Sequence, residues 1–196
     1  MWRCMDVSDA QIIAQSQSSP ERFADLVRRH HGAIFGYAAR RVGVTDAEDV
    51  ASETFAIAFS RRAIYDNAYP SAAPWLYGIA NNLIRGHRRT ERRALLAYSR
   101  TGTDPLRPTT TQQTDRGIDA AVAGAVAAMK PNHRDALLLY ALAELSYDEV
   151  GLAMGVPVGT VKGWIARART TATRELAARG IPHAASIEPG KEVSAP

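Results

Sequence analysis

The side chains of this chain best suited to chemistry are basic and amide groups concentrated in two segments. One is ANNLIRGHRRTERR at residues 80–93, where Asn81, Arg85, Arg88 and Arg92 fall on one side of a helix by their spacing. A row of guanidinium groups neutralises phosphates and releases counterions from a nucleic-acid backbone. The chemistry expected here is binding of phosphates and bases, not the making or breaking of covalent bonds.

The second segment is LSYDEVGLAMGVPVGTVKGWIARAR at residues 145–169. Ser146 and Glu149 form a predicted capping box, Gly155 supplies a turn, and Pro157 suits the first position of a second helix. This order predicts a helix-turn-helix whose second helix enters the DNA major groove. The alternative is a helical hairpin with a solvated face, which the agreement of cap, turn and basic surface disfavours.

Helical spacing assigns opposite faces of this second segment. We expect the apolar side chains to point inward, namely Val150, Met154, Val161, Ile165 and Ala168. Another face carries Thr160, Gly163, Trp164 and Arg167.

An acidic segment precedes the first basic one. The sequence predicts a helix at residues 45–62, opened by a capping box of Thr45 and Glu48, with Asp46, Asp49 and Glu53 on one side. An exposed acidic stripe repels phosphate and suits a basic protein partner. Acids in a first turn also favour the helix dipole, and this alternative explains part of the pattern equally well.

Helical periodicity also positions these segments within the chain. Helices are predicted at residues 20–42, 45–62, 74–98, 118–129 and 131–145, followed by the two-helix unit, with a loop at 63–73. The Thr-, Pro- and Gly-rich stretch 99–117 predicts a flexible linker, and 181–196 a disordered tail. We therefore expect an all-α protein of two small helical domains, residues 1–98 and 118–180.

Composition excludes several classes of protein. The 196 residues carry a formal net charge of +4, and the single cysteine, Cys4, fits a reducing cytoplasm. No apolar run approaches the roughly 20 residues that span a bilayer, so we expect no membrane insertion. The histidines lack metal-ligand spacing, and no glycine-rich phosphate loop or nucleophile elbow occurs. We expect no enzyme, no metal or other cofactor, and no small-molecule substrate.

Three motifs in this order resemble the extracytoplasmic-function, or group IV, RNA polymerase sigma factors of the sigma-70 family, especially the actinobacterial type. DAEDVASETFAIAFSRR resembles the polymerase-binding helix of that family. PWLYGIANNLIRGHRRTERR resembles its promoter-melting helix, and the segment at 145–169 resembles its helix-turn-helix. The resemblance implies a sigma factor that binds core RNA polymerase and directs promoter recognition and transcription initiation. It also implies an anti-sigma protein as a partner.

The resemblance further implies roles for individual residues. Polymerase binding falls to Asp46, Asp49, Ser52 and Glu53, with Ser52 where the family more often has glutamine. The residues implied to bind single-stranded DNA of the downstream promoter element are Asn67, Asn81, Asn82, Arg85, Arg88, Arg89 and Arg92. The loop at 65–71 is implied to receive a base flipped from the duplex. The residues implied to bind duplex DNA of the upstream element are Thr160, Lys162, Gly163, Trp164, Arg167 and Arg169.

Several alternatives remain open at this level. The main rival is a dimeric helix-turn-helix repressor or activator that acts without polymerase, although the sequence offers no obvious dimer seam. Trp75 either packs in a core or stacks on bases, and Trp164 either contacts DNA or packs inward. The two domains are compatible with a compact arrangement and with a flexible pair.

Overall fold

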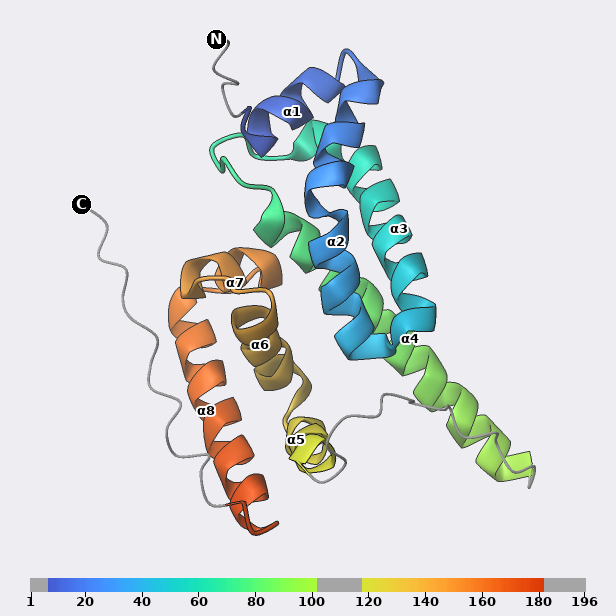
Figure 1. The fold of residues 1–196 in the computed structure, drawn as a ribbon, viewed down its shortest axis with the longest axis vertical. Helices are drawn as coiled ribbons and strands as arrows, with labels where there is room; N and C mark the ends of the chain where they lie inside the picture. Colours follow the sequence, from blue (N-terminus) through green and yellow to red (C-terminus); the bar gives the residue numbers. More distant parts are fainter. Residues whose placement is uncertain (1–6, 102–117, 182–196) are drawn as a thin grey trace.

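The computed structural model describes residues 7–101 and 118–181, with side chains described at 7–90 and 120–181. Within these residues every regular element is helical, which confirms the all-α class (Figure 1). The elements are α1 (Asp9–Ser16), η1 (Pro20–Arg22), α2 (Phe23–Val42), α3 (Val44–Ser60), η2 (Arg62–Ile64), α4 (Ala73–Thr101), α5 (Ile118–Ala127), α6 (Pro131–Leu142), α7 (Tyr147–Met154) and α8 (Val158–Ala177).

The N-terminal half is built on α2 and α3, which lie side by side with α4 crossing behind them (Figure 1). Ile34 and Tyr37 of α2 and Leu76 and Ile84 of α4 are almost completely buried. Burying such side chains is the main favourable contribution to folding, at about 1.5–3 kcal/mol each. The buried stripe of α4 therefore runs through Leu76 and Ile84, whereas Leu83 is only partly buried.

The start of α3 corrects one prediction. The helix begins at Val44, and no side chain caps it, so the predicted capping box of Thr45 and Glu48 is absent. Gly43, with φ of 88°, makes the whole connection from α2 to α3 in one residue. Thr45 consequently lies inside the first turn, where its hydroxyl cannot act as an N-cap, and Glu48 is 3.3 Å from His31 Nε2.

Helix α1 was not predicted. Ser8 and Gln11 form a capping box at its start, with Gln11 N–H donating to Ser8 Oγ and Ser8 N–H to Gln11 Oε1. Ile12 and Ile13 are buried. The predicted helix at 20–42 is divided into the single turn η1 and α2.

The boundary of the predicted linker also shifts. Helix α4 continues to Thr101, so the first three residues of the stretch 99–117 are helical. The rest of that linker, the side chain of Arg92 and the predicted tail after Ile181 lie outside the described residues.

The C-terminal half contains the predicted helix-turn-helix in α7 and α8. The Ser146–Glu149 capping box is present, and Gly155 at φ 66° and ψ 37° adopts the left-handed conformation of the turn. Four of the five predicted inward residues are buried, and Met154 is partly buried. Pro157 occupies the N-cap position of α8, one residue before its predicted place at the first helical position.

The two halves pack against each other. Ala136 and Leu139 of α6 and Val150 of α7 belong to the same hydrophobic cluster as the core of α2 and α4. Helices α4 and α7 meet at the buried Gly78, where an added Cβ would lie 2.6 Å from the carbonyl oxygen of Ala153. Only glycine permits this approach, and the structure therefore has the compact arrangement of the two domains.

Candidate nucleic-acid interface

The basic face of α4 is turned toward the C-terminal half. Arg41 Nη2 lies 2.5 Å from Asp135 Oδ1, and both side chains are no more than 2% exposed. Arg85 Nε lies 3.0 Å from the other carboxylate oxygen, Asp135 Oδ2. We call Arg41, Arg85 and Asp135 the interdomain ion cluster, because α2 and α4 supply the cations and α6 the anion.

Further hydrogen bonds surround this cluster. Arg41 Nη1 donates to Tyr37 Oη at 2.6 Å and to Asn81 Oδ1 at 3.1 Å. Burial raises the pKa of Tyr37, so its hydroxyl stays protonated and donates to Asn81 Oδ1 at 3.2 Å. Asn81 is only 2% exposed, so it contacts protein groups instead of solvent in this arrangement.

Two predicted DNA-binding arginines of α4 are also engaged by protein. Arg85 Nη2 donates to Asn132 Oδ1 of α6, in addition to its ion pair with Asp135. Arg88 Nη2 donates to the carbonyl of Arg41 at 2.7 Å. Burial, with the nearby charges of Arg41 and Arg134, lowers the pKa of Arg88. Asn81, Arg85 and Arg88 thus share one face of α4, as predicted. The end of α2 and the start of α6 cover this face.

Other candidate DNA-binding residues face solvent. Asn82 and Arg89 are exposed on α4, and Asn67 is exposed in the loop before it. These side chains can reach a nucleic acid without any movement of the C-terminal half.

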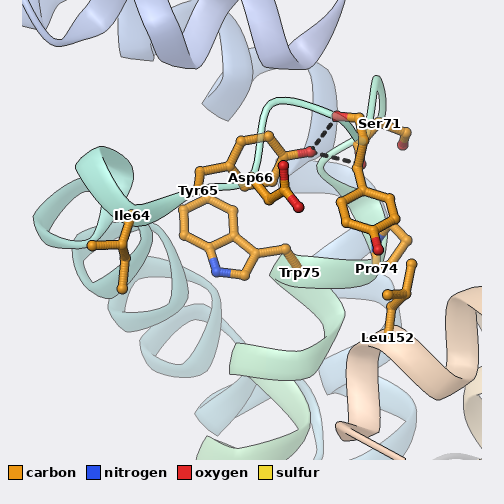
Figure 2. A pocket seen from close by; sticks show the side chains of 8 residues that line it. Ile64, Tyr65, Asp66, Ser71, Pro74, Trp75 and Leu152 are labelled. Atoms are coloured by element: carbon orange, nitrogen blue, oxygen red, sulfur yellow. Dashed lines mark hydrogen bonds between the residues drawn. The ribbon is translucent and has the colours of Figure 1, made fainter. Parts of the chain in front are cut away.

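A pocket of about 240 Å³ lies beside this loop (Figure 2). The rings of Tyr65 and Trp75 lie 5.0 Å apart at one wall, and Leu152 of α7 reaches the opposite side. The pocket is lined by Ile64, Tyr65, Asp66, Tyr69, Ser71, Pro74, Trp75 and Leu152. Trp75 is half-buried, so it packs on Tyr65 and also presents ring surface to the pocket.

Tyr65 shapes the loop that borders the pocket. Its hydroxyl donates to the carbonyls of Tyr69, at 2.7 Å, and Ser71, at 3.0 Å. Burial, with the charges of Asp9 and Asp66, raises the pKa of Tyr65 to about 12, so the hydroxyl remains a donor at neutral pH. Sequence reasoning identified the loop but not this tyrosine as its organiser.

The acidic residues of α3 form a second surface. Asp49, Ser52 and Glu53 are exposed, whereas Asp46 is half-buried and lies 3.7 Å from His87 Nε2 of α4. Asp49, Ser52 and Glu53, called here the α3 acidic surface, are therefore free to meet a basic partner.

The predicted DNA-facing residues of α8 divide into two groups. Lys162 and Arg167 are exposed and Thr160 and Gly163 are partly exposed. Trp164 is partly buried with its ring 6.4 Å from that of His133, and the Arg169 guanidinium lies 5.5 Å from the centre of the Tyr140 ring. Trp164 and Arg169 thus pack on α6. In this arrangement Trp164 therefore packs inward.

The described residues contain neither a metal-binding cluster nor a membrane-spanning helix. No three His, Cys, Asp or Glu side chains there are grouped as ligands of one metal ion. None of the helices in that part of the chain combines the length and apolar character needed to cross a membrane.

Comparison with known families gives two matches. The family model for sigma-70 region 2 matches residues 26–94, and that for sigma-70 region 4 matches residues 119–171. The ECF RNA polymerase sigma factor SigE of Mycolicibacterium smegmatis is 31% identical over 159 residues, covering 78% of this chain and 61% of SigE. The RNA polymerase sigma factor CnrH of Cupriavidus metallidurans is 30% identical over 175 residues, covering 83% of this chain and 91% of CnrH.

Solved structures agree with these matches. CnrH in complex with the cytosolic domain of CnrY aligns with a TM-score of 0.63 at 28% identity, covering 87% of this chain and 97% of CnrH. The sigma factor RpoE of Bartonella quintana, solved with the anti-sigma factor NepR, aligns with a TM-score of 0.58 at 20% identity, covering 79% of this chain and 96% of RpoE. The second likeness concerns the fold alone.

Proposed function

Because the chain belongs to the extracytoplasmic-function group of the sigma-70 family of RNA polymerase sigma factors, we propose how its surfaces bind core polymerase and promoter DNA. The family membership favours this function over a dimeric repressor or activator that acts without polymerase. The α3 acidic surface is the polymerase-docking site. Its three residues are exposed and form no ion pair with a basic side chain within the described residues. The carboxylates of Asp49 and Glu53 repel phosphate, so a basic protein surface is the partner that fits.

The downstream promoter element meets α4 and the loop before it as single-stranded DNA. Arg89 contacts phosphate, and Asn82 and Asn67 contact bases, since all three face solvent. The pocket beside Tyr65 and Trp75 takes a base extruded from the duplex. Extrusion costs a few kcal/mol, and stacking on aromatic rings returns about 1–3 kcal/mol per base.

The upstream element meets α8 in the major groove of duplex DNA. Lys162 and Arg167, with Thr160 beside them, form the exposed edge that approaches base edges and phosphates. Trp164 and Arg169 act indirectly, by holding α8 against α6.

The compact arrangement is the closed state of this protein. In it Asp135 and Asn132 occupy the guanidinium group of Arg85 that a DNA phosphate would otherwise use, and this observation carries the proposal. Leu152 also stands at the pocket that takes the base. Reading the downstream element with Asn81 and Arg85 therefore requires α6 and α7 to leave α4.

The remaining partners follow from the family. Relatives have been solved with CnrY and with the anti-sigma factor NepR, so an anti-sigma protein is the proposed regulator. We assign the chain no catalytic chemistry and no cofactor, and place its action in the cytoplasm with RNA polymerase.

The docking assignment is tested by charge reversal on α3. Asp49→Arg should weaken binding to core polymerase, whereas Glu21→Arg, an exposed acid on η1, should not. Both variants should keep the helical circular dichroism spectrum and melting temperature of the wild type. Wild-type affinity of Asp49→Arg for core polymerase would show that α3 is not the docking site.

A further inference from the structure

The N-terminal helix α1 holds both ends of the loop that forms the pocket. At its C-terminal end, the carbonyl of Ser16 accepts a hydrogen bond from Arg62 Nε of η2, just before the loop, at 3.2 Å. At its N-terminal end, Ala10 N–H donates to the carbonyl of Pro70 at 3.4 Å. Helix α1 lies outside both family matches, the first of which begins at residue 26.

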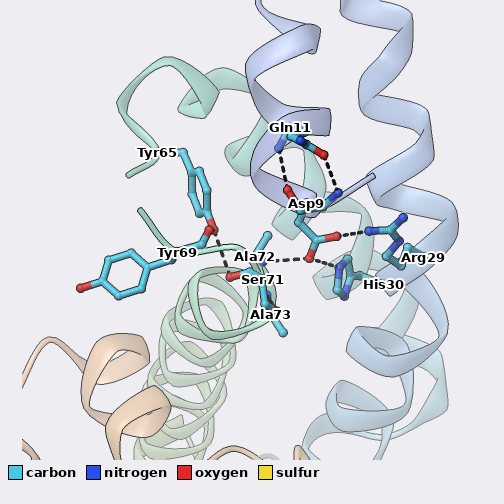
Figure 3. Close-up of polar contacts among 10 residues, drawn as sticks. Asp9, Gln11, Arg29, His30, Tyr65, Tyr69, Ser71, Ala72 and Ala73 are labelled. Carbon is cyan, nitrogen blue, oxygen red and sulfur yellow. Dashed lines mark hydrogen bonds and ion pairs between the residues drawn. The ribbon is translucent and has the colours of Figure 1, made fainter. Parts of the chain in front are cut away.

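Asp9 makes the decisive contact of α1 with this loop (Figure 3). Its Oδ2 accepts the backbone N–H of Ala72 at 2.8 Å and lies 2.7 Å from His30 Nε2. Its Oδ1 accepts from Arg29 Nη1 at 2.6 Å. The carboxylate is therefore buried but fully compensated, at the point where the loop enters α4.

Electrostatics favours the ionised form of Asp9 that makes this contact. Burial alone opposes the ionisation of Asp9, but the hydrogen bonds from His30 and Ala72, with the charge of His30 and the bond from Arg29, lower its pKa to about 2. The side chain is ionised throughout the physiological pH range. An ionised acceptor makes a stronger hydrogen bond to the Ala72 N–H than a neutral one.

Asp9 and Tyr65 restrain the same wall of the pocket from opposite sides. The Tyr65 hydroxyl holds the carbonyls of Tyr69 and Ser71 from inside the loop. Asp9 holds the N–H of Ala72, which belongs to the same peptide group as the Ser71 carbonyl, from outside it. Without the outer restraint, the segment that carries Tyr69 and Ser71 is held by the Tyr65 hydroxyl, the 3.4 Å contact at Pro70 and local hydrogen bonds of the loop, such as Tyr69 N–H to the carbonyl of Asp66.

We propose that Asp9 is a positioning residue for base capture: it fixes the wall formed by Tyr69 and Ser71 so that the pocket is preorganised for an extruded base. This inference rests on the proposed function of the pocket. It assigns to α1 a role in reading the downstream element, although α1 itself lies outside the basic surface.

The geometry separates three variants of this site. Asp9→Ala removes the acceptor of Ala72 N–H and should loosen the loop. Asp9→Asn can keep an oxygen at the Oδ2 position, where it still accepts Ala72 N–H, but it loses the ion pair with Arg29 and the charge interaction with His30. Gln11→Ala removes the side-chain bond of the capping box of the same helix and leaves the loop contacts intact, so it is the matched control for general destabilisation of α1.

The test measures the penalty for a missing base. Full-length protein with core polymerase is bound to forked promoter DNA in which one non-template nucleotide at a time is abasic. In the wild type, the captured position should show an affinity loss of about ten-fold, the size expected of one stacking interaction. Trp75→Ala should abolish the penalty at that position, which identifies the pocket independently of Asp9.

The outcomes then separate cleanly. Asp9→Ala should lose most of the penalty at that one position, while Asp9→Asn and Gln11→Ala retain it. A full penalty in Asp9→Ala, or an equal loss in Gln11→Ala, would overturn the positioning role. If Trp75→Ala leaves the abasic penalty unchanged at every position, the proposed function of the pocket itself fails.

Discussion

The interdomain ion cluster gives the sharpest prediction, through the variant Asp135→Ala. This change removes the only carboxylate that contacts Arg41 among the described residues and leaves a guanidinium that is 1% exposed without a countercharge. It also releases Arg85, which is more than one-third exposed and can turn to water. In Asp135→Ala, the closed state is therefore destabilised mainly by the unpaired charge of Arg41.

The size of that cost follows from the burial. Removing one partner of a buried ion pair typically costs about 3–5 kcal/mol, because the remaining charge is uncompensated. Separation of the two halves exposes Arg41 to water and avoids this cost, so Asp135→Ala shifts the equilibrium toward the open state by up to roughly 10²–10³-fold.

The assay is energy transfer between dyes on the two halves of the free protein. Ala24 of α2 and Thr170 of α8 are exposed and suit cysteine labelling after Cys4→Ser. Asp135→Ala should lower the transfer efficiency in the absence of polymerase. Its apparent affinity for single-stranded DNA of the downstream element should rise, because Asn81 and Arg85 are uncovered in a larger fraction of the protein.

Asp148→Ala is the control, because it removes the same charge from an exposed position on α7. It should leave both readouts at wild-type values. Wild-type transfer efficiency and wild-type affinity for this single-stranded DNA in Asp135→Ala would refute the reasoning, since the ion cluster would then contribute nothing to the closed state.

Other consequences can be measured separately. Gly78→Ala places a methyl group against the carbonyl of Ala153 and should open the same seam without changing any charge; unchanged energy transfer would contradict the close approach of α4 and α7. Arg167→Ala should weaken binding to upstream duplex DNA at an unchanged melting temperature, whereas Arg169→Ala should lower the melting temperature by removing the contact with Tyr140; the reverse pattern would exchange their roles. The folded-state pKa of Asp9 is lowered from 3.8 to about 2, so its stabilisation, roughly 2 kcal/mol, is present above the unfolded pKa and is lost as pH falls through about 2. Asp9→Asn should therefore lose less stability than the wild type in urea unfolding between pH 4 and 2, and equal losses would contradict the assignment.

Local sequence patterns predicted the elements that short-range interactions determine. Ser146, Glu149 and Gly155 act within one helix and its turn, so their types and spacing were sufficient to place α7 and the turn. The same pattern at Thr45 and Glu48 was misleading, because Gly43 allowed α3 to begin one residue earlier. Helix α1 carried a detectable signal in Ser8 and Gln11, but eight residues give too short a stretch for helical periodicity.

The contacts between distant segments could not be predicted in this way. Arg41 and Asp135 are separated by 94 positions, and neither residue belongs to a motif that indicates pairing. Asn81, Arg85 and Arg88 were correctly placed on one face of α4, but the sequence carries no sign that α6 covers that face. Trp164 likewise has no local signature that distinguishes packing on His133 from contact with DNA.

Reconstituted transcription tests the central claim most directly. Purified full-length protein is mixed with core RNA polymerase and a library of promoter sequences, and the start sites are read from the transcripts. The account predicts initiation that depends on the protein, at promoters with an upstream and a downstream element at a fixed spacing. Binding of the protein to duplex DNA as a symmetric dimer, with no polymerase association and no new start sites, would contradict it.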